Sequence, residues 1–200
     1  MKRRGRLQGL LFFFFLLPFS FLLACSRNAP PETSPAAAAP PAAAPPSVAA
    51  APAPGDTWKD PTSGLTWQAA PTGGPLKWAE AQTHCASLRL GGFNDWRLPT
   101  ISELRSLVRG CPATQNHGSC GVTDSCTTSR CWKDACKECA GQGGPGPGGA
   151  YWPSELSGDA SWCWSSSPVS DADGAWSVGF GDGQVGRRYI NIPAGARCVR

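Results

Sequence analysis

Residues 91–104 read GGFNDWRLPTISEL, and they contain the clearest helix start in the chain. Thr100 and Glu103 form a capping box, in which each side chain bonds the backbone of the other residue. After this start, apolar residues recur at the spacing of one helix face. These residues are Ile101, Leu104, Leu107 and Val108. Gly110 is placed to end the helix, so the stretch predicts a short, well-capped helix.

A second helix and two short strands are predicted upstream. Residues 76–88 predict a helix whose apolar face consists of Trp78, Ala81, Cys85 and Leu88. Gly91 and Gly92 follow and are expected to end it. Residues 58–67 read WKDPTSGLTW, a pattern typical of two short strands around a Pro/Ser/Gly turn.

The C-terminal part of the chain predicts strands. Residues 162–166 are one strand, and apolar side chains alternate with small ones over residues 176–180. The dipeptide at 182–183, Asp-Gly, predicts a tight turn, and residues 184–190 predict the returning strand. Residues 196–200 predict a last strand. Together with the two helices, this order predicts an α+β fold.

The first 24 residues have the features of a lipoprotein signal peptide. Their charged start consists of Lys2, Arg3, Arg4 and Arg6. A short apolar core follows, and Leu-Leu-Ala before Cys25 resembles a lipobox, which predicts cleavage there and acylation of the Cys25 thiol. Ser26 after the cysteine is typical of outer-membrane lipoproteins, periplasmic or surface-exposed. Ordinary secretion, with Cys25 incidental, is the alternative.

Residues 25–55 predict a disordered Ala/Pro-rich tether, because they offer too little apolar surface to form a core. Residues 56–200 are then one domain. The net charge of +4 comes wholly from the signal peptide, since the rest of the chain has equal numbers of basic and acidic residues. A neutral domain lacks the field that concentrates polyanions, so we expect no nucleic-acid partner.

The domain is rich in cysteine, and an exported chain favours disulfides. A Cys/Gly-rich insertion over residues 111–150 holds Cys111, Cys120, Cys126, Cys131, Cys136 and Cys139. Sequence alone does not choose among their pairings. A thiolate zinc site over residues 126–139 and a redox dithiol at Cys136 and Cys139 are the alternatives. Cys163 is the odd cysteine and is expected to be free or intermolecular.

Six segments occur in an order that resembles the Lcl C-terminal domain family, named for a bacterial collagen-like adhesin. They are DPTSGLTWQ at 60–68, the W-x-x-A helix with a cysteine at 76–85, GGFNDWRLPTISEL at 91–104, WSS at 164–166, AWSVGF at 175–180 and RCVR at 197–200. The resemblance covers nearly all of residues 56–200. It implies a C-type lectin-like fold, in which two helices flank a small twisted antiparallel sheet and the termini are paired. It also implies distant similarity to formylglycine-generating enzymes.

The resemblance also implies properties of individual residues. It pairs Cys85 with Cys198, because lectin-like folds tie the first helix to the last strand. It leads us to expect a partner for Cys163 near position 150, where this chain has Ala150. Glycans are the ligand class that it favours, on a surface-exposed binding or adhesion module.

The resemblance to lectin-like folds makes calcium the cofactor to consider. Asp171 and Asp173 are acidic neighbours, and Asn94 and Asp95 stand beside Trp96. Neither pair matches the ligand spacing of an EF-hand, and short Asp/Gly runs chiefly form turns, so we favour turns and expect no metal or cofactor.

Catalysis finds little support in the sequence. His84 and His117 are the only histidines, and no serine-hydrolase, metalloprotease or phosphate-loop motif is present. The C-terminal strands do carry a basic group: Arg187, Arg188, Arg197 and Arg200. Arg187 and Arg188 are candidate contacts for a sulfated or acidic glycan, with solvated strand faces as the alternative.

The sequence therefore predicts a non-enzymatic, membrane-anchored lipoprotein with a binding or adhesion module for a glycan or envelope polymer. One alternative is a structural lipoprotein that binds protein partners. Another is an enzyme related to formylglycine-generating enzymes, which needs a reactive cysteine pair.

Overall fold

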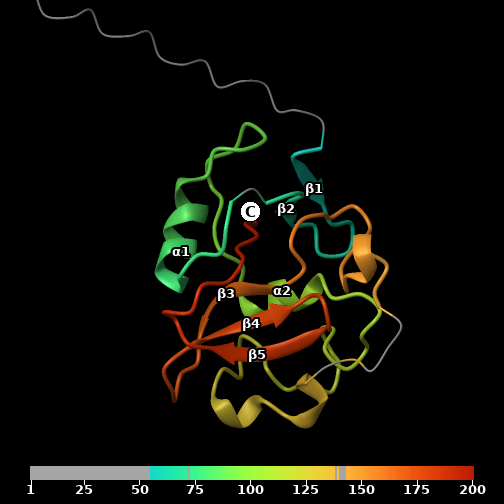
Figure 1. Ribbon diagram of the computed structural model, residues 1–200, viewed down its shortest axis with the longest axis vertical. Coiled ribbons are helices and arrows are strands. Elements are labelled where there is room, and N and C mark those ends of the chain that lie inside the picture. Colours follow the sequence, from blue (N-terminus) through green and yellow to red (C-terminus); the bar gives the residue numbers. More distant parts are fainter. Residues whose placement is uncertain (1–54, 72, 138, 140–142) are drawn as a thin grey trace, which may run out of the picture. The chain divides into compact units, whose positions relative to one another are not determined.

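A three-stranded antiparallel sheet lies at the centre of the domain (Figure 1). Its strands, in spatial order, are β3 (Trp162–Pro168), β4 (Ala175–Gly179) and β5 (Gln184–Arg188). The predicted strands at 162–166, 176–180 and 184–190 are thereby confirmed with small shifts of their ends. β5 ends at Arg188, because the following segment, from Tyr189 onward, is an exposed turn.

This computed structural model describes residues 55–200 except residues 72, 138 and 140–142. All described residues belong to one unit, residues 47–200. The signal peptide, Cys25 and the tether up to residue 54 lie outside the described residues, so their predictions stay predictions. Within the described part, no helix has the length and apolar character needed to cross a membrane.

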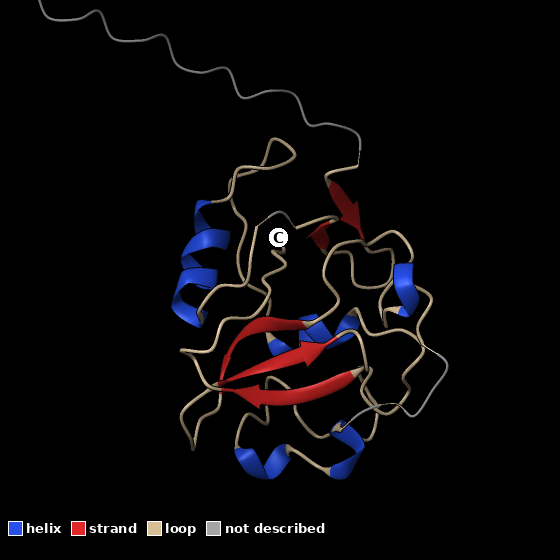
Figure 2. Ribbon diagram, in the orientation of Figure 1, coloured by secondary structure: helices blue, strands red, loops and turns tan. Residues whose placement is uncertain are grey.

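The two predicted helices are present (Figure 2), and their buried residues belong to two separate cores on opposite faces of the sheet. Helix α1 (Trp78–Ser87) buries Ala81 and Cys85 against Trp164 of β3. Helix α2 (Ile101–Ser106) buries its apolar stripe against Trp176 of β4. Because side chains alternate along a strand, each face of the sheet contributes to its own core.

The capping box of α2 forms as predicted. The backbone N–H of Thr100 donates to Glu103 at 2.8 Å, and the Glu103 N–H donates to the Thr100 hydroxyl at 3.2 Å. Helix α1 is slightly shorter than the predicted range 76–88, since it begins at Trp78 and ends at Ser87, before Gly91 and Gly92. These two glycines instead form the turn between Leu90 and Phe93, which pair with each other.

The two ends of the described chain lie together. Strands β1 (Thr57–Lys59) and β2 (Thr66–Gln68) form the predicted hairpin. The predicted strand at 196–200 is not a regular strand. It forms an isolated antiparallel bridge at Val199, with Trp67 of β2 on one side and Arg97 on the other, and Arg200 exchanges two backbone hydrogen bonds with Thr66 of β2. The C-terminal segment thus connects β2 to Arg97, which lies just before α2.

Disulfides connect these parts. Cys85 of α1 is bonded to Cys198, as the resemblance implied. The insertion contains three further disulfides, Cys111–Cys139, Cys120–Cys136 and Cys126–Cys131. The zinc and dithiol alternatives are therefore not realised, because each of their cysteines is bonded in one of these pairs. Cys163 is a free and buried thiol.

The described residues of the insertion have little regular structure, namely the short 3-10 helices η1 (Ser129–Cys131), η2 (Asp134–Cys136) and η3 (Pro147–Gly149). Arg105 of α2 anchors the insertion to the rest of the domain. The buried Arg105 guanidinium donates to three of its backbone carbonyls, those of Thr114, Gln115 and Val122. A segment that cannot form a core is thus held by disulfides and by one arginine.

Candidate functional site

A groove of about 440 Å³ lies along β5, the edge strand of the central sheet, and is called the β5 groove below. The sheet forms one side of it, and the insertion forms the other. Its lining residues are Ser129, Trp132, Trp162, Trp176, Gln184, Gly186, Arg187 and Arg188. Three indole rings and two guanidinium groups therefore meet in one depression.

Trp162 lies flat against the sheet because Gly186 leaves room for its ring. A Cβ atom at Gly186 would lie 2.9 Å from Cη2 of Trp162, too close to fit, whereas one at Gly179 would be in ordinary contact with the ring at 3.5 Å. The half-buried indole therefore presents a flat platform in the groove. The guanidinium of Arg188 stands 5.3 Å from the centre of the Trp162 ring, within cation–π distance.

Two more tryptophans fix the insertion to the sheet. The indole N–H of Trp132 donates to the Val185 carbonyl of β5 at 2.8 Å. The indole N–H of Trp176 donates to the Thr127 carbonyl at 2.9 Å, from β4 to the insertion. One bond is donated by the insertion to the sheet and the other by the sheet to the insertion. Together they fix the two sides of the groove relative to each other.

The groove has an unbalanced positive charge. Among the described residues, neither Arg187 nor Arg188 forms a salt bridge with an acid. Arg187 is exposed and stacks on Tyr189, with its guanidinium 5.5 Å from the ring centre. The Nε atom of Arg188 is buried and has no hydrogen-bond partner among these residues. Because neither guanidinium is paired with a described carboxylate, an oxyanion in the groove would supply a charged partner.

The predicted basic group of four arginines does not exist as one cluster. Arg197 is buried and donates to carbonyls, those of Gln68 at 2.6 Å, Ala69 at 2.7 Å and Ser157 at 2.7 Å. Arg200 pairs with Asp95 at 2.7 Å. Of these four arginines, only Arg187 and Arg188 line the β5 groove, so these two remain the candidates for ligand binding.

Asp171, one of the two acidic residues considered as calcium ligands, has a structural role instead. The carboxylate of Asp171 accepts bonds from the backbone N–H and the hydroxyl of Ser129, both at 2.7 Å. These bonds hold the pKa of Asp171 below its ordinary value and anchor the start of η1 at the groove. Asp173 does not join it in a ligand set, and residues 55–200, outside the gaps, contain no group of three or more metal-ligating side chains.

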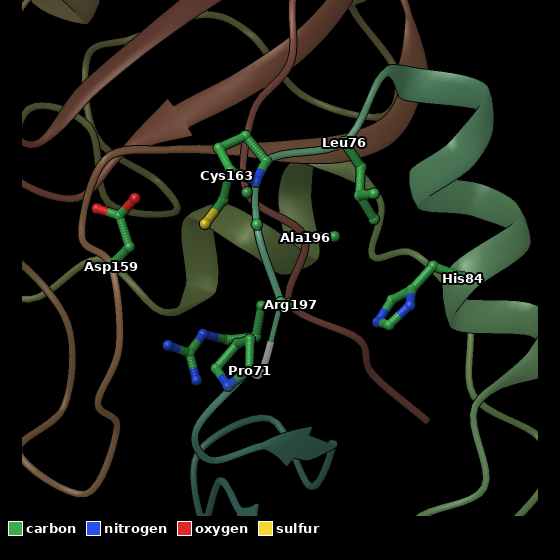
Figure 3. Close-up of a pocket in the computed structure, with 11 residues that line it drawn as sticks. Pro71, Leu76, His84, Asp159, Cys163, Ala196 and Arg197 are labelled. Carbon is green, nitrogen blue, oxygen red and sulfur yellow. The ribbon is translucent and has the colours of Figure 1, made fainter.

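A second, much smaller cavity of about 90 Å³ borders the free thiol (Figure 3). Cys163 of β3, Arg197 of the C-terminal segment and His84 of α1 line it. Burial raises the pKa of the Cys163 thiol to about 11, and burial lowers the pKa of Arg197 to about 10. A protonated, buried thiol is a poor nucleophile, so the surroundings of Cys163 do not activate it. His117 lies in neither the groove nor this cavity.

The tryptophan platform was not located from the sequence, although a signal for it exists. Trp162 pairs with Gly179 in the sheet register, and Gly186 follows on the next strand. Small residues beside an aromatic residue on adjacent strands indicate that the ring lies over them. Trp132 gave no such signal, because its position depends on the disulfides of the insertion.

Comparison with known proteins identifies the domain. The model of the Lcl C-terminal domain family matches residues 56–200, which are the bounds expected for the folded part. No curated protein and no solved structure gives a significant match. The match spans well over half of the chain and includes both helices, the central sheet and the insertion. The chain therefore belongs to the Lcl C-terminal domain family.

Proposed function

We propose that the protein is an envelope-anchored, non-catalytic binding module that holds an anionic glycan or a similar envelope polymer in the β5 groove. The carrying observation is the pair Arg187 and Arg188, which have no acidic partner among the described residues and stand beside Trp162. Guanidinium groups bind sulfate and carboxylate through paired hydrogen bonds. An indole face buries the apolar face of a sugar ring.

The composition of the groove supports binding rather than chemistry. Its described lining contains no histidine, carboxylate or thiol, the groups that most often transfer protons or attack a substrate. The one free thiol of the described chain, Cys163, is buried elsewhere and protonated at neutral pH. An adhesion module needs only a preformed surface, and the paired tryptophan bonds supply that rigidity.

We further propose that the fold is C-type lectin-like. Helices on opposite faces of a small sheet, paired chain ends and the Cys85–Cys198 disulfide all accord with that architecture. The acyl groups on Cys25 and the Ala/Pro-rich tether would hold the domain away from the outer membrane. The membrane is then the protein's second partner, reached through the anchor alone.

Binding to a polysaccharide panel tests the proposal. The oxidised full chain should bind sulfated and uronate-rich polymers saturably and neutral polymers at least tenfold more weakly. Binding should be the same in calcium and in chelator, because Ser129 already occupies the carboxylate of Asp171. Loss of binding on chelation would indicate that calcium takes part in the site. Absence of binding to every anionic polymer would refute the proposal.

A protein partner is the second candidate, and one observation favours it. Tyr189, Ile190 and Ile192 follow β5 and are 58%, 46% and 46% exposed. Apolar side chains gathered on one exposed turn are typical of protein-binding surfaces. If the panel gives no glycan ligand, a protein that loses binding on Ile190→Ser and Ile192→Ser substitution would establish this alternative.

A further inference from the structure

A polar pocket of about 490 Å³, separate from the β5 groove, lies at the C-terminal end of α2 and is called the α2 pocket here. Three segments that are far apart in the sequence meet there: the β1–β2 turn, α2 with the residues after it, and the start of the insertion. The lining residues are Thr62, Ser63, Arg105, Ser106, Val108, Arg109, Gln115, Asn116 and His117. None of them lines the β5 groove.

The pocket contains more positive than negative charge. Arg105 is 1% exposed and forms no salt bridge with a described acid, since its donors all go to carbonyls. Arg109 binds the carbonyls of Ser106 and Val108 through Nη1 alone. Its Nε and Nη2 atoms donate to no described residue within hydrogen-bond distance. These donors are available to a ligand.

The nearest carboxylate, Asp60, is already occupied. It accepts from the Thr62 N–H at 3.0 Å and from the Ser63 hydroxyl at 2.7 Å, and it is buried beneath this turn. Its Oδ1 atom forms a long salt bridge of 3.8 Å with Nη2 of Arg109, which is beyond hydrogen-bond distance. Asp60 therefore builds the wall of the pocket and leaves the free donors of Arg109 unsatisfied.

The backbone conformation of His117 is an independent indication that the α2 pocket is a binding site. Among the described residues it alone has a positive φ without being glycine, at 67°. This conformation is costly for a residue with a side chain, and such residues concentrate at binding and catalytic sites. The exposed imidazole lines the pocket together with Arg109. His117 thus adds a further N–H donor to the lining of the pocket.

We propose that the α2 pocket binds an oxyanion group, a sulfate, phosphate or carboxylate, through Arg109 and His117, with Arg105 contributing its charge. The amide side chains of Gln115 and Asn116 and the hydroxyls of the turn would bind the remaining atoms of the molecule that bears this group. The site is independent of the β5 groove, so it stands even if the groove binds no glycan.

The two histidines of the chain provide the test. In NMR spectra of the full chain, the imidazole proton resonances of His84 and His117 are followed while sulfate, phosphate or acetate is added at constant pH and ionic strength. His117→Asn assigns the signal, because asparagine tolerates positive φ. We expect the His117 signal to shift saturably with at least one anion, and the His84 signal to stay still. The anion that saturates at the lowest concentration identifies the group.

Variants separate this site from the groove. Arg109→Gln should weaken the apparent affinity at least tenfold, and Arg109→Lys should weaken it less, since lysine keeps the charge without the paired donors. The Arg187→Gln/Arg188→Gln chain should keep the full His117 shift. The proposal is overturned if the His117 signal shifts without saturation, if both histidine signals shift alike, or if Arg109→Gln leaves the affinity unchanged in a folded chain.

Discussion

At the residue scale, the environment of Cys163 decides what this cysteine does. It is the one described cysteine outside the disulfides, in a domain whose other cysteines are all bonded. Reactivity needs a thiolate, and burial opposes the charged form. The guanidinium of Arg197 favours the thiolate, but its effect is smaller than that of burial, and the pKa is raised to about 11.

Cys163 should therefore resist alkylation while the domain is folded. We expect iodoacetamide at pH 8 to leave Cys163 unlabelled in the native chain and to label it fully after denaturation without reductant. Peptide mapping by mass spectrometry measures both. Rapid labelling of Cys163 in the native chain would contradict its burial and would reopen the enzyme alternative.

The sequence predicted that Cys163 is unpaired, because that prediction needs only the number of cysteines in the domain. An odd cysteine in an exported domain leaves one thiol unpaired, and Ala150 stands where a partner was expected. Burial could not be foretold, because it depends on Gly195 and Arg197 packing against β3 from the far end of the chain. Only the folded chain brings these residues to Cys163.

At the element scale, α2 was the most predictable part of the fold. Its capping box is local, so the sequence contains all the residues that form it. What the sequence did not show is that Glu103 also binds Arg97, through two contacts of 2.6 Å. Burial raises the pKa of Glu103, but the bonds from Arg97 and Thr100 outweigh this effect, so its pKa lies below the ordinary value.

This lowered pKa predicts a pH dependence of stability. A carboxyl group with a depressed pKa stabilises the fold above its unfolded pKa of about 4.3. The stabilisation is then lost as the pH falls through the folded pKa. Denaturation midpoints between pH 6 and 2 should therefore fall less steeply for Glu103→Gln, which keeps the cap but not the charge, than for the wild type. Equal slopes for the two chains would contradict the ion pair with Arg97.

The insertion was the least predictable element. Its composition indicated that it needs disulfides, but the sequence does not determine how its six cysteines pair. The role of Arg105 was hidden as well, because an arginine beside the apolar stripe of a helix is ordinarily exposed to solvent. Only the fold shows that the Arg105 guanidinium satisfies three carbonyls of a segment without regular structure.

Arg105→Gln should consequently destabilise the domain by about 3 kcal/mol, because it leaves buried carbonyls without donors. Chemical denaturation measures the loss. Arg130→Gln is the matched control, since Arg130 is an exposed arginine of the same insertion and should change stability by less than about 0.5 kcal/mol. Equal losses for the two variants would show that Arg105 does not hold the insertion.

At the scale of the whole molecule, the disulfides have different tasks. Cys85–Cys198 spans 113 residues and joins α1 to the C-terminal segment. Cys126–Cys131 spans 5 residues and lies directly before Trp132 of the β5 groove. The long bridge restrains the unfolded chain strongly, whereas the short one acts mainly on the wall of the groove.

Double serine substitutions should reveal this difference. Cys85→Ser/Cys198→Ser should lower the free energy of unfolding by about 5 kcal/mol, and Cys126→Ser/Cys131→Ser by about 2 kcal/mol. The second pair should nevertheless lower the affinity for an anionic polymer, because Trp132 loses its support. Denaturation and polymer binding, measured on both variants, check the two statements. The reverse order of stability would refute the account of the long bridge.

The central claim is that Arg187 and Arg188 bind an anionic polymer, and one comparison tests it most directly. It measures dissociation constants for dextran sulfate, with neutral dextran as the matched polymer, for three full-length chains: the wild type, Arg187→Gln/Arg188→Gln and Arg89→Gln. Arg89 is exposed and outside the groove. We predict equal affinity for the wild type and Arg89→Gln and about thirtyfold weaker binding for the double variant. Undiminished binding by the double variant would contradict the claim.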